Sequence, residues 1–486
     1  MPVTWATYFF DAATNDRSSA GVHTTQVFLH ALASLFCFLA LRRGTGSTFT
    51  SAWVAGVFAL HPLQVESVAW ASERKGVVAG TFWMLSFWLH AGPPSRVRRF
   101  GVPLAVCAAL GAKPISVTLP LVLLLWDAWP LGRMQDPAGR FAGAAVWRCV
   151  REKLPLLAAV VGLAVLTVMA QRDVGATASL DELSLGSRLA NAPLAYVGYL
   201  GAFFWPRDLA VFYPHPVVLS AWAVGGALAL LLAVTGFVVW QWRRAWWAMG
   251  WCWFLGALVP MLGIVQVGGQ ARADRYAYVT IVGLAIALGF GVRDRVRGPT
   301  LRAAAATLAV LTLVASAVET RRQLAYWVDG VTLFSRALEV VGPDALIHQH
   351  LGASLLQRGA VPAGRAHLEK AHELRPQVNV ANNLAWSYAT DPVDARVRPG
   401  RALLLARFAV QRQPEDPTVW DTFAAAQAAG GFFPRAIDSQ RRALSLLPAH
   451  ASEALRAGLA GRLALYERGE RFRAPPAPDA SGARNP

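Results

Sequence analysis

Long apolar stretches separated by short polar ones dominate the chain up to about residue 318. A helix that rises 1.5 Å per residue needs about 20 apolar residues to cross the hydrocarbon core of a bilayer. The candidate runs are 22–41, 51–65, 76–91, 101–111, 114–126, 154–171, 190–205, 217–240, 245–264, 277–292 and 301–318. The pattern predicts an all-α polytopic membrane domain over residues 1–318, with about 10–11 hydrophobic helices.

Two of these runs leave alternatives open. Lys113-Pro114 interrupts one apolar stretch, and proline disfavours helix in the residue before it, so two tilted helices or one broken helix fit equally. Run 190–205 is interpreted as interfacial or re-entrant, because a full span there would place Arg243 and Arg244 outside the cytoplasm. Basic loops favour the cytoplasmic side. This choice places the loop near residue 270, and everything after 318, on the extracytoplasmic side.

The pattern changes after residue 318. Segments 345–376 and 417–448 each fit a 34-residue helix-turn-helix repeat, with small residues where the two helices meet. Segment 382–414 fits it with about five inserted residues. We therefore expect a connecting helix at 319–344, three tetratricopeptide repeats forming an α-solenoid at 345–450, a capping helix at 451–473 and a disordered tail at 474–486.

Composition and charge support a membrane protein and argue against a nucleic-acid partner. Hydrophobic residues make up 55% of the chain, against about 45–50% in soluble domains. The net charge is +17, but much of the excess Lys and Arg flanks the apolar runs, as expected of cytoplasmic loops. The cysteines show no spacing typical of a disulfide framework or a zinc site.

The stretch "ALHPLQVESVAWASERKG" places several polar residues between two apolar runs. Pro62 suits the first turn of a helix, with His61 at its cap. A helix over 63–75 would put Glu66 and Glu73 on one face. One of these carboxylates could deprotonate an attacking hydroxyl, and nearby cations could stabilise a departing phosphate. A solvated loop that anchors two helices explains the same residues.

A second polar group, "QARADRYAYV", opens the run at 277–292. Its candidate residues are Gln270, Arg272, Asp274, Arg275 and Tyr276. Ionisable side chains at membrane depth indicate function, although a helix end whose side chains reach the interface is the alternative. Lys113 has the same two interpretations. No motif requires a cofactor, but two carboxylates could hold Mg²⁺ or Mn²⁺.

The segments "LHPLQVESVAWASERKG", "AKPISVTLPLVLLLWDAWPLGR", "FWPRDLAVFYPHP" and "VQVGGQARADRYAYV", followed by the repeats, show a resemblance. The chain resembles the transmembrane-and-tetratricopeptide-repeat O-mannosyltransferases and their bacterial relatives, within the GT-C glycosyltransferase superfamily. The resemblance implies transfer of a mannose-like sugar from a polyprenyl-phosphate donor to a protein Ser or Thr hydroxyl, or to another extracytoplasmic acceptor. It implies catalytic roles for Glu66 and His61. It also implies donor-phosphate contacts for Arg74, Lys75, Lys113, Gln270, Arg272, Asp274, Arg275 and Tyr276.

Members of this family begin with one further membrane helix and a loop whose acidic pair supplies the principal catalytic carboxylate. The present sequence opens at "MPVTW", after that pair, and Asp11 and Asp16 do not match it. The expected base is therefore Glu66 or an acidic residue upstream. A degenerate or truncated transferase and a non-catalytic membrane scaffold are the alternatives. A transporter would show paired repeats in the membrane half, which the sequence lacks.

The expected location is a multi-pass position in a membrane, the inner membrane if the protein is bacterial, with the repeats on the extracytoplasmic side. The expected partners are the polyprenyl-linked sugar, the bilayer and an acceptor polypeptide bound by the repeats.

Overall fold

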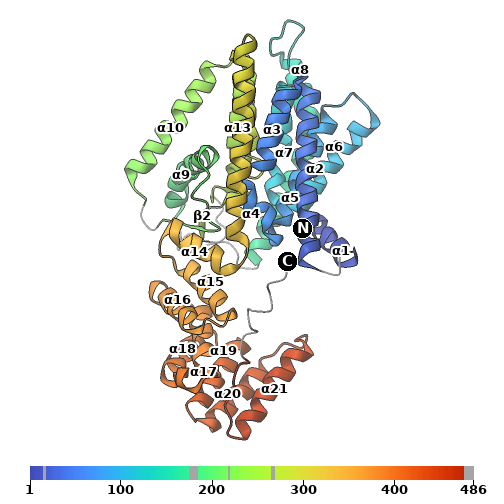
Figure 1. Cartoon of the computed structure of the whole chain (residues 1–486). Coiled ribbons are helices and arrows are strands. Elements are labelled where there is room, and N and C mark those ends of the chain that lie inside the picture. The colour runs from blue at the N-terminus through green and yellow to red at the C-terminus, as the bar shows by residue number, and fades with distance from the viewer. Residues whose placement is uncertain (15–17, 174–183, 217–218, 264–268, 476–486) are drawn as a thin grey trace. The chain divides into compact units, whose positions relative to one another are not determined.

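The computed structural model describes residues 1–14, 18–173, 184–216, 219–263 and 269–475, and it confirms the all-α class. The chain divides into two compact units, Met1–Val328 and Asp329–Pro486 (Figure 1). One short antiparallel pair is described, between β1 (Tyr213–Pro214) and β2 (Gln270–Arg272). Most of the tail that was expected to be disordered lies outside the described residues.

The first unit consists of α-helices joined by turns, several of which are short 3₁₀ helices, labelled η. Its helices are α1 (Pro2–Thr14), α2 (Ser19–Thr45), α3 (Thr48–Leu60), η1 (Pro62–Gln64), α4 (Val65–Ala69), η2 (Ala71–Glu73), α5 (Arg74–His90), α6 (Arg96–Ala112), η3 (Pro114–Thr118), α7 (Leu119–Ala128), α8 (Gly143–Asp173), α9 (Leu185–Phe204), α10 (Ala221–Trp240), α11 (Ala245–Leu258), η4 (Val259–Met261), η5 (Asp274–Tyr276), α12 (Ile281–Arg295), α13 (Pro299–Leu324) and η6 (Ala325–Trp327).

Aromatic packing and small residues build the core of this unit. Phe87 of α5 stacks on Trp253 of α11, with ring centroids 4.8 Å apart. Helices α11 and α12 approach closely, because a Cβ on Gly283 would lie only 2.4 Å from the carbonyl oxygen of Gly250. Small residues allow such backbone contact, which gains dispersion energy without requiring water around the pair. The contact fixes α12, whose preceding loop carries Arg275.

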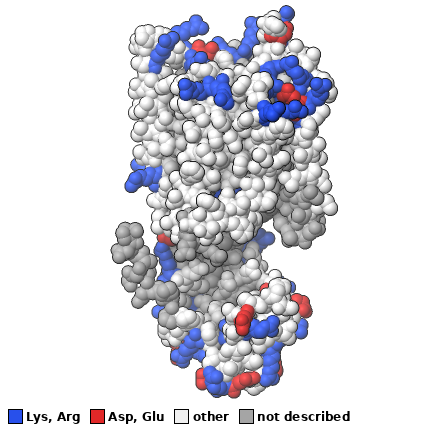
Figure 2. All heavy atoms as spheres, turned by 90° about the vertical axis from the view of Figure 1, so that its right-hand side faces the viewer, with Lys and Arg blue, Asp and Glu red and all other residues white. Residues whose placement is uncertain are grey.

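Three described helical segments are long and apolar enough to cross a membrane: Ser19–Thr45, Ala221–Trp240 and Pro299–Trp327. The last two are largely unburied within the unit, and Trp222 at the start of α10 is 91% exposed. Helices α5, α6, α11 and α12 are shorter. On the face that Figure 2 shows, most of the visible Lys and Arg side chains of this unit lie at its upper end, above a wide band that is nearly free of charge.

The interruption at Lys113-Pro114 is present as a break between two helices. Helix α6 ends at Ala112, Lys113 is extended, and the chain continues through η3 into α7. Proline at the first position of η3 has no N–H to donate, which ends the preceding helix.

The second unit is also helical. Its elements are α14 (Gly330–Val341), α15 (Ala345–Gln357), α16 (Val361–Leu374), α17 (Val378–Thr390), η7 (Asp394–Arg396), α18 (Pro399–Arg412), α19 (Pro417–Ala429), α20 (Phe433–Ser445) and α21 (Glu453–Glu467).

Successive helices of this unit pack in pairs, α15 on α16, α17 on α18 and α19 on α20. A Cβ on Gly352 would lie 2.8 Å from the carbonyl oxygen of Gly364, so the first pair requires small residues at its crossing. The η7 turn occupies the position where the sequence predicts inserted residues. The single connecting helix expected at 319–344 is wrong. Helix α13 ends at Leu324, and a new helix begins after Asp329, whose carboxylate accepts the Thr332 N–H.

Candidate functional site

The loop after α3 begins with a histidine cap. His61 accepts the Leu63 N–H at Nδ1 over 3.2 Å, and Pro62 takes the first position of η1, as the sequence predicts. The other ring nitrogen lies 2.9 Å from the Phe203 carbonyl oxygen, and the imidazole stacks on the Phe203 ring. Both nitrogens therefore have structural partners, and the catalytic role for His61 stays a prediction.

Residues 63–75 do not form the one continuous helix that would put Glu66 and Glu73 on a shared face, because the chain breaks at Trp70. The backbone of Trp70 is extended, with φ −85° and ψ 109°. The Gln26 side chain of α2 donates one hydrogen bond to the Ser67 carbonyl oxygen and one to that of Trp70, at 2.8 and 2.9 Å. These bonds satisfy carbonyl groups that a continuous helix would use internally. Glu66 and Glu73 consequently lie in separate short helices, α4 and η2.

Arg275 of η5 brings the two glutamates together. Its backbone N–H donates to Glu66 Oε2 over 2.8 Å, and its Nη1 lies 2.5 Å from Glu66 Oε1. Its Nε lies 3.5 Å from Glu73 Oε1. Both carboxylates are nearly buried, at 4% exposure. The structure thus joins two polar stretches whose central residues lie 209 positions apart in sequence.

Two lysines complete the positive surroundings of Glu73. Lys113, at the break before η3, places Nζ 2.8 Å from Glu73 Oε2, and Lys75 places Nζ 3.1 Å from Oε1. Lys75 is 29% exposed and Arg275 13% exposed, whereas Lys113 is 8% exposed. Lys75 and Arg275 are therefore the cations that an incoming anion reaches first. We call Glu66, Glu73, Lys75, Lys113 and Arg275 the bridged-glutamate site.

The two glutamates have pKa values shifted in opposite directions. Burial raises the pKa of Glu66 to about 7, against the opposing charge of Arg275. Burial acts on Glu73 in the same sense, but the charges of Lys113, Lys75 and Arg275 outweigh it and hold its pKa below the ordinary value. One carboxyl group can therefore exchange a proton near neutral pH while its neighbour stays ionised, an arrangement typical of acid–base sites.

Aromatic rings flank the Arg275 guanidinium. Its carbon atom lies 5.3 Å from the Trp70 ring centroid and 5.0 Å from that of Tyr276, within cation–π range. The Tyr276 hydroxyl accepts a hydrogen bond from Gln270 Nε2 over 2.8 Å. Gln270 and Tyr276 therefore help to orient the side chain of Arg275, which is the predicted phosphate contact beside them.

Asp274 and Arg272 face another partner, Tyr213 of β1. The Tyr213 hydroxyl donates to both Asp274 carboxylate oxygens, at 3.1 and 3.0 Å, and the Arg272 guanidinium stacks on the Tyr213 ring at 3.7 Å. These contacts hold the β1–β2 pair and so fix the loop that carries Arg275. Tyr213 was not among the predicted site residues, although its segment "FWPRDLAVFYPHP" is one of those that carry the family resemblance.

Arg74 has a different set of partners from the other predicted cations. Its side chain is fully buried, forms an ion pair with Asp11 of α1, and donates to the Val22 carbonyl oxygen over 2.7 Å. The guanidinium also lies over the Tyr8 ring. Asp11 was missed as a partner, and the available signal was its position as the one charged residue in an otherwise uncharged, aromatic helix.

The predicted carboxylates do not fit a divalent metal in this arrangement. Among the residues that the structure describes, no three His, Cys, Asp or Glu side chains come close enough together to hold an ion. Glu66 and Glu73 are matched instead by arginine and lysine. The chemistry proposed below for the bridged-glutamate site therefore uses only its side chains.

No protein-family model matches this chain, and no curated protein matches its sequence.

Proposed function

We propose that this chain is an integral membrane glycosyltransferase of the GT-C type, which moves a mannose-like sugar from a polyprenyl phosphate to a Ser or Thr hydroxyl or another extracytoplasmic acceptor. The observation that carries the proposal is the bridged-glutamate site, where one carboxyl group can accept a proton near neutral pH beside cations that suit a phosphate. The sequence resemblance to the O-mannosyltransferases supports the same reaction.

The apolar surface of the first unit supports a membrane location. Helices α10 and α13 leave most of their side chains unburied, and large apolar surfaces of this kind require lipid or a partner. Helices satisfy their own backbone hydrogen bonds, so they are suited to hydrocarbon. We take the shorter helices packed around them as further membrane segments, which makes the unit polytopic.

The proposed reaction uses Glu66 as the base. The carboxylate takes the proton of the acceptor hydroxyl, the hydroxyl oxygen forms a bond to the sugar C1, and the bond from C1 to the phosphate oxygen breaks. The electron pair stays on the leaving phosphate, where Arg275 and Lys75 stabilise the charge.

The contact between Arg275 and Glu66 suggests how donor binding prepares the base. A phosphate that binds Arg275 competes with Glu66 for the same guanidinium. When the arginine turns toward the phosphate, Glu66 loses the charge that opposes the effect of its burial, and its proton affinity rises. Donor binding would thus make the ionised Glu66 carboxylate a stronger base while the leaving group is in place, at the cost of a smaller ionised fraction at neutral pH.

The second unit is proposed to bind the acceptor. Its paired helices with small residues at their crossings suit tetratricopeptide repeats, which stack into a solenoid with a concave binding surface. A polypeptide held there would present Ser or Thr side chains to the membrane unit. The repeats would then lie on the same side of the bilayer as the bridged-glutamate site.

The test is transfer by the full chain in liposomes that contain a polyprenyl-phosphate mannose, with a Ser/Thr-rich peptide as acceptor. Glu66→Gln should lower transfer by on the order of 100-fold or more, because general-base catalysis contributes about 10²–10⁴-fold. The control is Glu415→Gln, which removes a carboxylate that is 78% exposed in the second unit. Its transfer rate should equal that of the unaltered chain.

Two outcomes would contradict this assignment. Full activity of a folded Glu66→Gln variant would exclude Glu66 as the base. If the unaltered chain neither transfers sugar in liposomes nor restores glycosylation in cells that lack it, while it still captures partners through the second unit, the scaffold interpretation would replace the transferase.

A further inference from the structure

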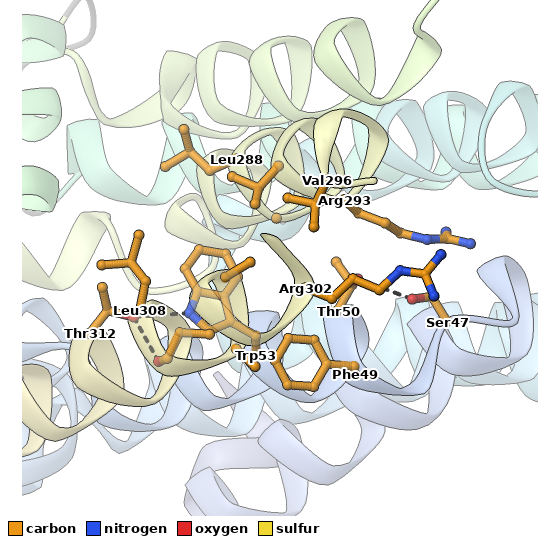
Figure 3. A pocket seen from close by; sticks show the side chains of 15 residues that line it. Ser47, Phe49, Thr50, Trp53, Leu288, Arg293, Val296, Arg302, Leu308 and Thr312 are labelled. Atoms are coloured by element: carbon orange, nitrogen blue, oxygen red, sulfur yellow. Dashed lines mark hydrogen bonds between the residues drawn. The ribbon is translucent and has the colours of Figure 1, made fainter. Parts of the chain in front are cut away.

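A cavity of about 690 Å³ lies between the start of α3, the end of α12 and the first half of α13. This volume falls within the range of about 300–1,000 Å³ that is typical of ligand pockets. Trp53, Leu288 and Leu308 form apolar parts of its wall, as Figure 3 shows. The cavity belongs to the first unit and shares no residue with the bridged-glutamate site.

The packing of α13 explains why the space is open. At the end of the cavity that Thr312 lines, α13 contacts α3 directly: the Trp53 indole donates to Thr312 Oγ1 over 3.1 Å, and a Cβ on Gly56 would lie 3.0 Å from Leu313. Nearer its start, α13 presents Ala305 and Ala309 to the same neighbours, and these side chains are too short to fill the gap. The result is an apolar groove along a helix that is otherwise unburied.

The two ends of the groove differ in chemistry. Arg293 and Arg302 point toward the end where Ser47 lies, and the opposite end is lined by Leu288, Leu308 and Thr312 (Figure 3). Among the described residues, neither arginine has a carboxylate partner. The nearest acidic residue in sequence, Asp294, is paired with Arg244 over 2.8 Å. Two uncompensated guanidinium groups beside an apolar groove are complementary to an anionic amphiphile.

We propose that this groove binds an anionic phospholipid, with one acyl chain along α13 and the headgroup phosphate held by Arg293 and Arg302. The inference rests on the proposed membrane location, but not on the transferase reaction. Along α13, Arg302 lies about 27 Å from Thr320, at a rise of 1.5 Å per residue. Thr320 bonds the Leu60 carbonyl oxygen at the start of the loop that carries the bridged-glutamate site. The groove is thus remote from the donor phosphate, at the basic end that attracts anionic lipid.

The experiment is native mass spectrometry of the full chain, released from membranes that contain phosphatidylglycerol and phosphatidylcholine with identical acyl chains. The unaltered chain should retain phosphatidylglycerol preferentially. Arg293→Gln together with Arg302→Gln should lower that preference on the order of tenfold, because each basic residue near a membrane surface contributes appreciably to anionic lipid binding. A thermal melt in the same detergent checks that the variant is folded.

Two further variants separate the groove from general surface charge. Arg243→Gln with Arg297→Gln removes the same charge from exposed residues that do not line the cavity, and should leave retention unchanged. Ala305→Phe with Ala309→Phe fills the groove while both arginines remain, and should lower retention as well. Glu66→Gln should retain lipid normally, so failure of the transferase proposal would leave this result intact.

Three outcomes would overturn the proposal. Equal retention of the two lipids would show that the arginines do not recognise the phosphate. An equal loss in the Arg243/Arg297 control would assign the preference to the basic surface as a whole. Displacement of phosphatidylglycerol by a polyprenyl phosphate at equal concentration would identify the occupant as the donor lipid instead.

Discussion

Glu66 and Glu73 are buried to the same extent, and their neighbours leave their pKa values shifted in opposite directions. Glu66 has one cationic partner and a pKa near 7, whereas Glu73 has three cationic partners and stays ionised. In the proposed reaction Glu66 must be deprotonated to act, so the fraction of the protein that is competent should fall as the pH drops below the pKa of Glu66.

The first prediction follows from this titration. The rate constant kcat/KM should fall about tenfold per pH unit below about pH 7 and level off above it. The residual activity of Glu66→Gln should lack this acidic limb, since glutamine does not titrate. Transfer rates measured across that range with a donor in slight excess would check both statements, and an unchanged limb in the variant would assign the titration to another group.

The second prediction concerns the pairing of Glu66 with Arg275. Removal of one partner from a buried ion pair costs about 3–5 kcal/mol, because the other is left uncompensated. Arg275→Gln should therefore destabilise the chain more than Glu66→Gln with Arg275→Gln does. Denaturant unfolding in detergent measures the coupling, and all three variants should transfer sugar far more slowly than the unaltered chain. Strictly additive free energies would show that the two side chains are not coupled.

At this scale several residues that the sequence singled out lie together in the structure, whereas their contacts were not predicted. Glu66, Lys113 and Arg275 were selected from composition and resemblance, and the structure brings them into one site. The contacts of Arg74 could not be predicted from the sequence, because helical periodicity treats residues 63–75 as one continuous helix. The break at Trp70 depends on the Gln26 side chain from another helix, a contact that leaves no local pattern.

Among the elements, α11 and α12 depend on a glycine contact. Any side chain at Gly283 would meet the backbone of Gly250 and Phe254, at 2.4 and 3.0 Å, so the helices would have to separate. We expect Gly283→Val to cost about 1–3 kcal/mol, as overpacked cores do. The loop with Arg275 leads into α12, so activity should fall with stability.

Gly236→Val is the matched control for this third prediction. Gly236 lies in α10, where an added Cβ meets nothing within 4 Å. Thermal melts of both variants in one detergent should separate them by several degrees, with the control at the unaltered value. Equal melting temperatures would show that α11 and α12 tolerate separation.

Element boundaries were predictable where their cause is local. Pro114 ends α6 through its own ring and missing N–H, so the break at Lys113 could be read directly. The boundary at Asp329 was missed, because apolar periodicity continues on both sides of it. Asp329 caps the start of α14. Whether α13 ends before this cap depends on the geometry of the turn between the two helices.

For the whole molecule, the proposed topology makes the fourth prediction. In a chain whose four native cysteines are replaced, Ser72→Cys and Gln357→Cys should react with an impermeant maleimide in intact cells. Arg297→Cys should react only after the membrane is opened. All three positions are exposed, so access to the reagent depends on the side of the bilayer. Labelling of position 357 only in opened cells would place the second unit in the cytoplasm.

The amino-acid composition predicted a helical protein with an apolar half, because surfaces that face lipid and surfaces that face water differ in amino-acid content. Composition could not predict how many helices cross a bilayer. Among the described residues, three segments meet the requirements of length and composition, while α5, α11 and α12 are shorter and largely packed against neighbours. Their apolar character reflects burial in protein as much as contact with lipid.

In the proposed membrane location, the pairing of Arg74 with Asp11 would connect the bilayer to the bridged-glutamate site. Helix α1 exposes Trp5, Phe9 and Phe10, which suit the interface between lipid and water. Its buried Asp11 holds Arg74, and the next residue toward the N-terminus, Glu73, receives the lysines. A change in membrane thickness that displaces α1 would also displace Arg74 and the adjacent Glu73. The geometry of the site would then depend on the lipid bilayer.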